Sequence, residues 1–384
     1  MKKVRLGIIG MGNMGTAHAK SLQDGKVPGC ELAGVFDVDK ASLARFPDIK
    51  SYGDTGEMFR SGDVDAVLVA TPHYSHTTIG IEALENGIHL LVEKPISVHK
   101  ADCERLIAAH EKNPNLVFAA MFNQRTEPYY KKVRELVKNG ELGRIWRINW
   151  IITTWFRTET YYASGGWRAT WKGEGGGVLL NQCPHQLDLF QWIFGMPAKV
   201  RSFCGFRKFH DIEVEDDVTA YMEYADGATA IFITNTGEAP GTNRLEVVGE
   251  QGRLVVEDQQ LNFLRNEVPM SEFSRTSDQA FARPDVWEVS IPVKGTAGKH
   301  VEILRNFTDA ILHGKELIAP AAEGIHSVEL ANAMLYSAFR DATVELPLDG
   351  AAYEEALNQK IQGSTHQKKV VRKSDEDFTK SFDA

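Results

Sequence analysis

Three glycines near the N-terminus have the spacing of a loop that wraps around a pyrophosphate. They directly follow an apolar run and stand where a helical pattern begins. The first allows a tight turn, the second lets a phosphate approach the backbone, and the third, Gly15, lets the helix pack closely on the strand. The helix would also aim unpaired N–H groups and its positive dipole end at the phosphates. The predicted dinucleotide contacts of this loop are Gly10, Gly12, Asn13 and Met14.

An acidic residue at the end of the next apolar run completes this pattern. Asp37 follows residues 31–36, at the distance from the glycine loop that the dinucleotide fingerprint requires. A carboxylate there accepts hydrogen bonds from the ribose hydroxyls and repels a 2′-phosphate. We therefore expect NAD as the cofactor, in preference to NADP.

Four further stretches combine polar and small residues, and together they resemble the Gfo/Idh/MocA oxidoreductases. They are residues 70–76, residues 83–89, Glu93-Lys94-Pro95 and residues 175–185. The resemblance covers nearly the whole chain to about residue 347. It implies a sugar or polyol dehydrogenase, similar to glucoside 3-dehydrogenases, levoglucosan dehydrogenase and inositol 2-dehydrogenases.

The resemblance places Lys94 and His185 beside the nicotinamide and the reacting carbinol. Hydride loss from a secondary alcohol requires loss of the hydroxyl proton to a base within reach, and histidine is a suitable base. A desolvated Lys94 could hold the developing alkoxide and share in proton transfer. The cofactor contacts that the resemblance implies beyond the glycine loop are Thr71, Pro72, His73, His76, Glu93, Lys94, Asn123, Trp167 and Arg168.

Asn181 departs from the family pattern, which commonly has aspartate four residues before the histidine. Because an amide cannot exchange a proton, we assign Asn181 to orienting a substrate hydroxyl. A spacing of four would place Asn181 and His185 on one helical face. Pro184 deletes a backbone donor between them, so we expect a local kink.

Aromatic and basic residues are concentrated between residues 155 and 171. Aromatic rings offer flat faces to sugar rings, and guanidinium groups can bind their hydroxyls. Residues 123–125 and a tyrosine just beyond should form another wall of the cleft. With Arg168 assigned to the cofactor and no lysine cluster nearby, we expect a neutral sugar, glycoside or polyol, oxidised at C3 of a glucose-like ring or, second, at C2 of an inositol. The expected substrate contacts are Lys94, Arg125, Tyr130, Trp155, Arg157, Tyr162, Asn181 and His185.

Three other functions remain open at this point. The same fold can retain NAD and use transient oxidation to cleave a glycosidic bond, which would release free sugar without net NADH. A non-catalytic NAD-binding regulator is a weaker alternative, since Lys94 and His185 are both present. A metal site on His73, His76 or Cys183 with His185 lacks further ligands at suitable spacing, so we predict no metal.

The composition argues against several classes of protein. Hydrophobic residues make up 43% and charged residues 25%, and no apolar run is long enough to cross a bilayer, so we expect neither disorder nor a membrane partner. A net charge of −9 without a basic stripe argues against nucleic acid. Four cysteines without CxxC spacing indicate reduced thiols and hence a cytoplasmic protein.

The length of 384 residues favours two domains. In residues 1–122, buried strands alternate with helical stretches near 14–24, 74–86 and 99–111, which predicts a doubly wound parallel sheet, a Rossmann domain. The expected strands are Val4–Ile9, Glu31–Phe36, Ala66–Ala70, His89–Val92 and Val117–Met121.

Residues 123–363 predict a second α/β domain, for substrate binding and oligomerisation. Strand-like runs near 145–156, 198–209, 216–236 and 243–264, with turns at Asp226-Gly227 and Gln251-Gly252, indicate a large, mostly antiparallel, open-faced sheet. Helices near 298–313 and 323–340 should cover one face, and the other should pair with a second copy in a homodimer or homotetramer. Residues 364–384 predict a loosely packed polar tail or an arm on a neighbouring subunit.

Overall fold

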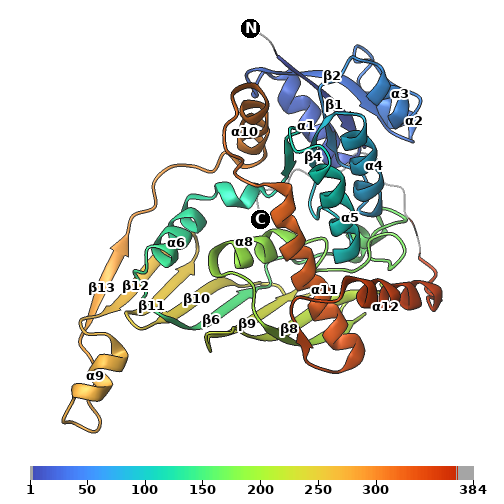
Figure 1. The fold of residues 1–384 in the computed structure, drawn as a ribbon. Helices are drawn as coiled ribbons and strands as arrows, with labels where there is room; N and C mark the ends of the chain where they lie inside the picture. The colour runs from blue at the N-terminus through green and yellow to red at the C-terminus, as the bar shows by residue number, and fades with distance from the viewer. Residues whose placement is uncertain (1–2, 369, 371–384) are drawn as a thin grey trace.

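The computed structural model describes residues 3–368 and 370, which form two α/β domains, one above the other in Figure 1. The first contains a five-stranded parallel sheet with the order β2-β1-β3-β4-β5. Its strands are β1 (Val4–Ile9), β2 (Cys30–Phe36), β3 (Ala66–Val69), β4 (His89–Val92) and β5 (Phe118–Ala120). The five predicted strands are confirmed, with ends that differ by at most a single residue.

Helices join these strands, and the first of them begins at the glycine loop. The helices are α1 (Asn13–Gln23), α2 (Lys40–Leu43), α3 (Thr55–Arg60), α4 (Tyr74–Glu85) and α5 (Lys100–Glu111). Gly10 has φ +92°, and a Cβ there would lie 2.7 Å from the carbonyl group of Ala70. A side chain at Gly15 would collide with the carbonyl oxygen of Gly10. The roles predicted for these two glycines therefore have a steric cause.

The second domain contains a nine-stranded sheet with the order β13-β12-β11-β10-β6-β9-β8-β7-β14. All neighbouring pairs are antiparallel except β6 with β9. The predicted turns at Gly227 and Gly252 are confirmed. A further turn at Asp258 and Gln259, which was not predicted, divides the run at 243–264 into three strands instead of two. The strands are β6 (Ile145–Ile152), β7 (Lys199–Phe206), β8 (Glu215–Glu223), β9 (Thr229–Asn235), β10 (Asn243–Gly249), β11 (Gly252–Glu257), β12 (Gln260–Asn266), β13 (Val286–Ile291) and β14 (Val344–Glu345).

Helices cover one face of this sheet, on its upper side in Figure 1. The covering helices are α6 (Pro128–Lys138), α8 (Pro184–Phe194) and α11 (Gly324–Arg340). The core beneath them contains Trp150 of β6, Phe190 of α8 and Phe232 of β9. The remaining short or peripheral elements are α7 (Glu159–Ala163), α9 (Met270–Thr276), α12 (Gly350–Gln362), η1 (Asn123–Thr126) and η2 (Ala321–Glu323).

One helix expected on the large sheet belongs to the other domain. Helix α10 (Lys299–His313) lies beside the first domain in Figure 1, and Ile303, Leu304 and Phe307 are buried in the same hydrophobic core as β1. The expectation that α10 covers the antiparallel sheet was therefore wrong. Because the chain returns to the first domain after β13, the boundary at residue 122 does not separate the two cores completely.

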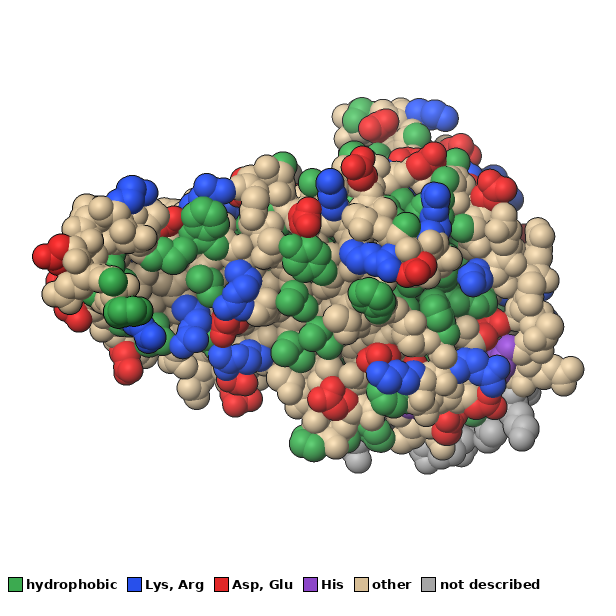
Figure 2. Space-filling model, turned by 90° about the horizontal axis from the view of Figure 1, so that it is seen from below, with side chains coloured by type: hydrophobic (Ala, Val, Ile, Leu, Met, Phe, Trp, Pro, Cys, Tyr) green, Lys and Arg blue, Asp and Glu red, His purple; other side chains and the backbone are tan. Residues whose placement is uncertain are grey.

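The opposite face of the large sheet carries exposed apolar side chains. Figure 2 views the molecule from this underside and shows hydrophobic side chains spread among charged ones. Phe203 of β7, Tyr221 of β8 and Ile231 of β9 are 63%, 43% and 37% exposed, and they alternate with buried residues along their strands. This alternation confirms the predicted open face.

The described start of the C-terminal tail lies against its own chain. Ser364 Oγ donates a hydrogen bond to Glu213, and Lys368 Nζ donates to the backbone oxygen of Arg168. The rest of the tail predicted for residues 364–384 lies outside the described residues.

Candidate active site

A cavity of about 690 Å³ lies between the two domains, at the carboxyl ends of the Rossmann strands. Ligands of open α/β sheets bind at this edge, because the connecting loops diverge there. Residues from both domains line the cavity, which is therefore a composite site. The predicted site residues among its lining are Gly10, Gly12, Asn13, Met14, Asp37, Thr71, Pro72, His73, His76, Glu93, Lys94, Asn123, Trp155, Arg157, Trp167, Arg168, Asn181 and His185.

Three residues expected to bind substrate do not line this cavity. Arg125 is 1% exposed, and its guanidinium donates to both carboxylate oxygens of Asp188, at 2.7 and 2.6 Å, and to Glu323. Tyr130 packs in the core of the second domain, and the buried Tyr162 donates its hydroxyl proton to Thr236 Oγ1 at 2.8 Å. These three residues stabilise the fold around the site, and the prediction that they contact the substrate was wrong.

The dinucleotide end of the cavity is formed by the glycine loop and the end of β2. Asp37 accepts hydrogen bonds from the backbone N–H groups of Met11 and Asp39, at 2.5 and 2.7 Å. No side chain caps the N-terminus of α1 at Gly12, and a Cβ added there would meet no described atom within 4 Å. The uncapped helix and the fixed carboxylate fit a pyrophosphate and an adenosine ribose respectively.

Buried polar atoms without partners among the described residues lie farther along the cavity. They are Thr71 Oγ1, Asn123 Oδ1, Trp155 Nε1, Arg157 Nε, Gln182 Oε1 and His185 Nδ1. A buried polar atom without a hydrogen bond is costly, typically about 1–3 kcal/mol. The lining therefore fits a polar ligand such as a nicotinamide riboside with a hydroxylated substrate beside it.

Lys94 stands where β4 ends and reaches across to the second domain. Its Nζ donates a 2.8 Å hydrogen bond to the backbone oxygen of Asn181. Desolvation lowers the pKa of the Lys94 ammonium, and the neighbouring Glu93 carboxylate opposes this shift. Arg168 and Arg157 lower the pKa further by repulsion. Lys94 is thus a partly buried cation whose proton is held less firmly than in water.

A buried carboxylate and two histidines lie behind Lys94. His18 Nε2 donates to Glu93 Oε1 at 2.7 Å. Desolvation alone would raise the pKa of Glu93. The hydrogen bond from His18 and the attraction of His18, His300 and Lys94 outweigh it and hold this pKa at about 2. Burial lowers the pKa of His300 to about 4. His300 lines the cavity from α10 and was missed, because its helix was assigned to the wrong domain.

His185 is the second residue of α8. Burial lowers its pKa well below the ordinary value, and repulsion by Lys94 and His300 adds to the shift. A neutral imidazole has one nitrogen that can accept a proton. Pro184 occupies the first position of the helix, where a missing N–H costs nothing, so the expected kink is absent. Asn181 precedes the helix, and the two side chains meet at the cavity without sharing a helical face.

Asn181 is the centre of a hydrogen-bonded group. Tyr161 donates its hydroxyl proton to Asn181 Oδ1 at 3.2 Å, and Arg168 Nη1 and Gln182 Nε2 donate to the Tyr161 oxygen at 2.9 and 3.1 Å. Glu174 accepts a hydrogen bond from Asn181 Nδ2. Tyr161, Gln124 and Gln182 also line the cavity. These three residues belong to the polar and aromatic stretches noted in the sequence, but residue type alone did not identify them as site residues.

Aromatic rings and guanidinium groups alternate on the wall of the second domain. The Trp167 ring lies edge-on to His73, with centroids 5.5 Å apart. Arg168 lies over the rings of Trp167 and Tyr161, and Arg157 over that of Tyr161. Neither arginine forms an ion pair with a carboxylate in the part of the chain that the structure describes.

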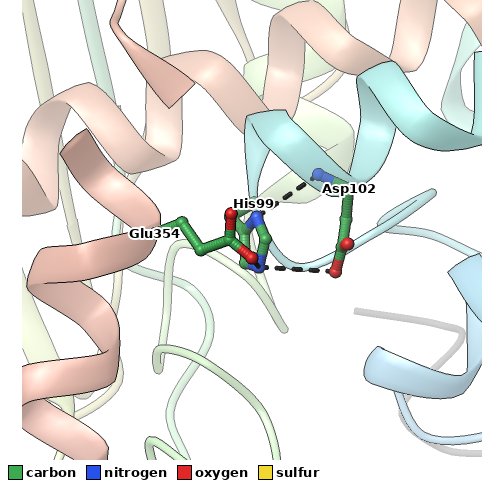
Figure 3. A group of neighbouring side chains, drawn as sticks. All are labelled: His99, Asp102 and Glu354. Carbon is green, nitrogen blue, oxygen red and sulfur yellow. Dashed lines mark hydrogen bonds and ion pairs between the residues drawn. The ribbon is translucent and has the colours of Figure 1, made fainter. Parts of the chain in front are cut away.

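The residues considered for a metal site are held in other ways. Both ring nitrogens of His76 lie 2.8 Å from backbone carbonyl oxygens, those of Pro95 and Thr71. His99, Asp102 and Glu354 form a group with metal-like spacing away from the cavity (Figure 3), but Arg105 donates to both of its carboxylates. Arg105 already pairs with both carboxylates, so we assign no metal to this group.

No helix within the described residues is long and apolar enough to cross a membrane.

Comparisons with known proteins agree with this geometry. Residues 4–121 match the oxidoreductase family with an NAD-binding Rossmann fold, and residues 130–255 match the GFO/IDH/MocA C-terminal domain. Myo-inositol 2-dehydrogenase from Thermotoga maritima is 26% identical over 267 residues, which are 66% of this chain and 75% of the relative.

Two solved structures have the same fold. WlbA dehydrogenase from Chromobacterium violaceum, in complex with NADH and UDP-GlcNAcA, has a TM-score of 0.78 at 25% identity, over 91% of this chain and 97% of its own. Levoglucosan dehydrogenase, in complex with NADH and levoglucosan, has a TM-score of 0.74 at 21% identity, over 90% and 100%. None of these relatives supports the alternative of a glycoside hydrolase. The chain belongs to the GFO/IDH/MocA family and is an oxidoreductase with an NAD-binding Rossmann domain.

Proposed function

We propose that the protein oxidises a ring secondary hydroxyl of a sugar, glycoside or polyol to the ketone, with C3 of a glucose-like ring as the first expectation and C2 of an inositol as the second. The main support is that Lys94, Asn181 and His185 line one cavity together with the glycine loop, which forms its dinucleotide end. When bound, NAD supplies the hydride acceptor.

The chain's own residues then have distinct roles. His185, kept neutral by its lowered pKa, accepts the hydroxyl proton. The Lys94 ammonium stabilises the negative charge that develops on the substrate oxygen, because it is a cation in a partly desolvated site. The Asn181 amide and the Tyr161 hydroxyl orient neighbouring hydroxyls.

The shape and lining of the cavity support a small hydroxylated ring. A volume of about 690 Å³ must accommodate a dinucleotide as well as the substrate. The rings of Trp155 and Trp167 offer flat apolar faces, and amides from Gln124, Asn181 and Gln182 offer both donors and acceptors. The similarity to a myo-inositol dehydrogenase favours the same class of substrate.

A second candidate substrate is a sugar acid. Arg157 Nε is buried without a hydrogen-bond partner among the described residues, and Arg157 and Arg168 face the cavity without carboxylate partners. A guanidinium in this position could bind a carboxylate bidentately. We keep the neutral substrate first, because Arg168 is engaged by Tyr161 and by the rings around it.

The substrate class can be tested with NAD and a panel of methyl glucosides, inositols, anhydrosugars and glucuronides. We expect the highest kcat/KM with a neutral glucoside or inositol, and NMR of the product should place the ketone at C3 or C2 respectively. The variant Arg157→Met should then change kcat/KM by less than about tenfold, as should Arg253→Met on the exposed sheet surface. Strong activity restricted to glucuronides, lost in Arg157→Met alone, would instead establish the sugar-acid substrate.

The catalytic assignments predict the effect of two substitutions. Lys94→Ala and His185→Ala should each lower kcat by at least about 100-fold, the scale of a lost acid–base group. NADH binding, followed by fluorescence, should survive His185→Ala. The exposed Lys138→Ala serves as the control with unchanged kcat. Near-normal turnover in either variant would contradict the role assigned to that residue.

Asp37 is expected to determine the choice of cofactor. Asp37→Ser removes the charge that repels a 2′-phosphate, and Arg45, whose Nη2 donates to the backbone oxygen of Met11 at 2.5 Å, lies close enough to the loop to attract one. The preference for NAD over NADP in kcat/KM should narrow by at least about tenfold, or ~1.4 kcal/mol. Asp48→Ser, on the exposed surface, should leave the ratio unchanged. An unchanged ratio in Asp37→Ser would place ribose recognition elsewhere.

We also propose that the open sheet face pairs with a second copy of the chain. Phe203→Glu would add a charge to the exposed apolar face, so sedimentation velocity should show a shift from dimer or tetramer toward monomer. Phe281→Glu is the matched control, since Phe281 is 97% exposed outside the sheet. A wild-type monomer, or an assembly that Phe203→Glu leaves intact, would refute pairing through this face.

A further inference from the structure

Glu174 is a buried carboxylate just behind the cavity wall. It directly precedes the triple glycine at residues 175–177 and is 1% exposed. Its Oε2 accepts a hydrogen bond from the backbone N–H of Ala169 at 2.5 Å, and its Oε1 accepts one from Asn181 Nδ2. Each carboxylate oxygen therefore has a donor, and both donors belong to segments that line the site.

The contact with Glu174 determines which way the Asn181 amide points. An ionised carboxylate can only accept hydrogen bonds, so the NH₂ group of the amide must face Glu174. The carbonyl oxygen Oδ1 then faces Tyr161, whose hydroxyl donates to it at 3.2 Å. Lys94 Nζ is bound to the backbone oxygen of the same asparagine at 2.8 Å. The amide is thus held from both sides in one of its two orientations.

The other contact of Glu174 holds the neighbouring loop. Ala169 has φ +50°, in the left-handed region that residues with a side chain rarely occupy. Its N–H group points at Glu174 in this conformation, and the preceding residue is Arg168, which donates to Tyr161. One carboxylate therefore links the amide of Asn181 with the loop that presents Arg168.

We propose that Glu174 is a positioning residue of the dehydrogenase reaction, which orients the Asn181 amide so that its carbonyl oxygen accepts hydrogen bonds on the cavity side. The proposal rests on the function proposed above. It also gives a physical reason for the neutral residue at position 181, because a carboxylate there would lie in hydrogen-bond contact with Glu174.

The charges around Glu174 determine what such a second carboxylate would do. Arg168, Lys368 and Lys94 attract the Glu174 anion, whereas Glu215 repels it. Desolvation raises the pKa of Glu174 despite these cations. In Asn181→Asp, two buried carboxylates in contact would share one proton, so one pKa of the pair would rise well above that of the unfolded chain. In the double variant Glu174→Gln, Asn181→Asp, the amide and the carboxylate exchange places and the pair again carries one charge.

The contact can be tested by thermal unfolding between pH 5 and pH 8. A raised folded-state pKa stabilises the protein only at low pH and loses its contribution as the pH rises. Relative to wild type, the Tm of Asn181→Asp should therefore fall by at least about 4 °C across this range. The double variant, which lacks the paired carboxylates, should follow the wild-type curve.

The positioning role can be tested by kcat and KM with a substrate found in the panel. In Glu174→Gln, the Asn181 amide can turn to present its NH₂ group, so kcat should fall at least about tenfold while KM changes less than threefold. The double variant restores an acceptor at position 181 and should recover kcat to within about fivefold of wild type. Glu238→Gln is the matched control, because Glu238 also accepts from an asparagine amide, that of Asn235, outside the cavity lining. Its kcat should not change.

Two results would overturn the proposal. One is an Asn181→Asp unfolding curve parallel to that of wild type, and the other is a double variant no more active than Glu174→Gln. If wild type oxidises no member of the panel, the proposed function fails. The unfolding curves still decide then whether Glu174 holds position 181.

Discussion

The hydrogen bond between Lys94 Nζ and the backbone oxygen of Asn181 is the contact on which the site depends, because it joins the two domains with a partly buried cation. A charge removed from water must be compensated by nearby dipoles or opposite charges. Here the compensation comes from Glu93 on one side and from the carbonyl group of Asn181 on the other. Moving the domains apart would break this hydrogen bond and change the charge balance at the reacting end of the cavity.

The titratable groups around this cation differ in protonation state. Glu93 is kept ionised by His18, whereas His185 and His300 are kept neutral by burial and by the nearby positive charges. Alcohol oxidation requires a neutral base for the hydroxyl proton and, beside it, a cation that stabilises the negative charge developing on the substrate oxygen. Environments that shift the pKa values of neighbouring groups apart are characteristic of acid–base sites, which agrees with the roles proposed for Lys94 and His185.

The parts of the site that the sequence predicts well are those set by local backbone geometry. The glycine loop, Asp37 and the Glu93-Lys94 pair each follow a parallel strand, and the carboxyl ends of such strands meet at one edge. Residue type alone could not tell which face of an element meets the cavity. Arg125 and Tyr162 therefore seemed suited to a sugar, whereas the fold uses them for an internal ion pair and a core hydrogen bond.

Long-range contacts explain what the sequence did not reveal. His300 enters the cavity because α10 returns to the first domain, and periodicity gives the apolar face of a helix but not the core that receives it. Glu174 acts in an irregular loop, where no period relates it to Asn181 or Ala169. The only sequence signal was an acidic residue immediately before three glycines.

We propose that the substrate is oxidised by hydride transfer to NAD from a ring carbon that lies beside Lys94 and His185. This transfer is tested most directly by using a substrate deuterated at the reacting carbon and measuring the label in the nicotinamide product by mass spectrometry and NMR. We expect one deuteron at C4 of NADH for each ketone formed, together with a primary isotope effect on single-turnover oxidation. Unlabelled NADH, or release of free sugar with no ketone, would contradict it.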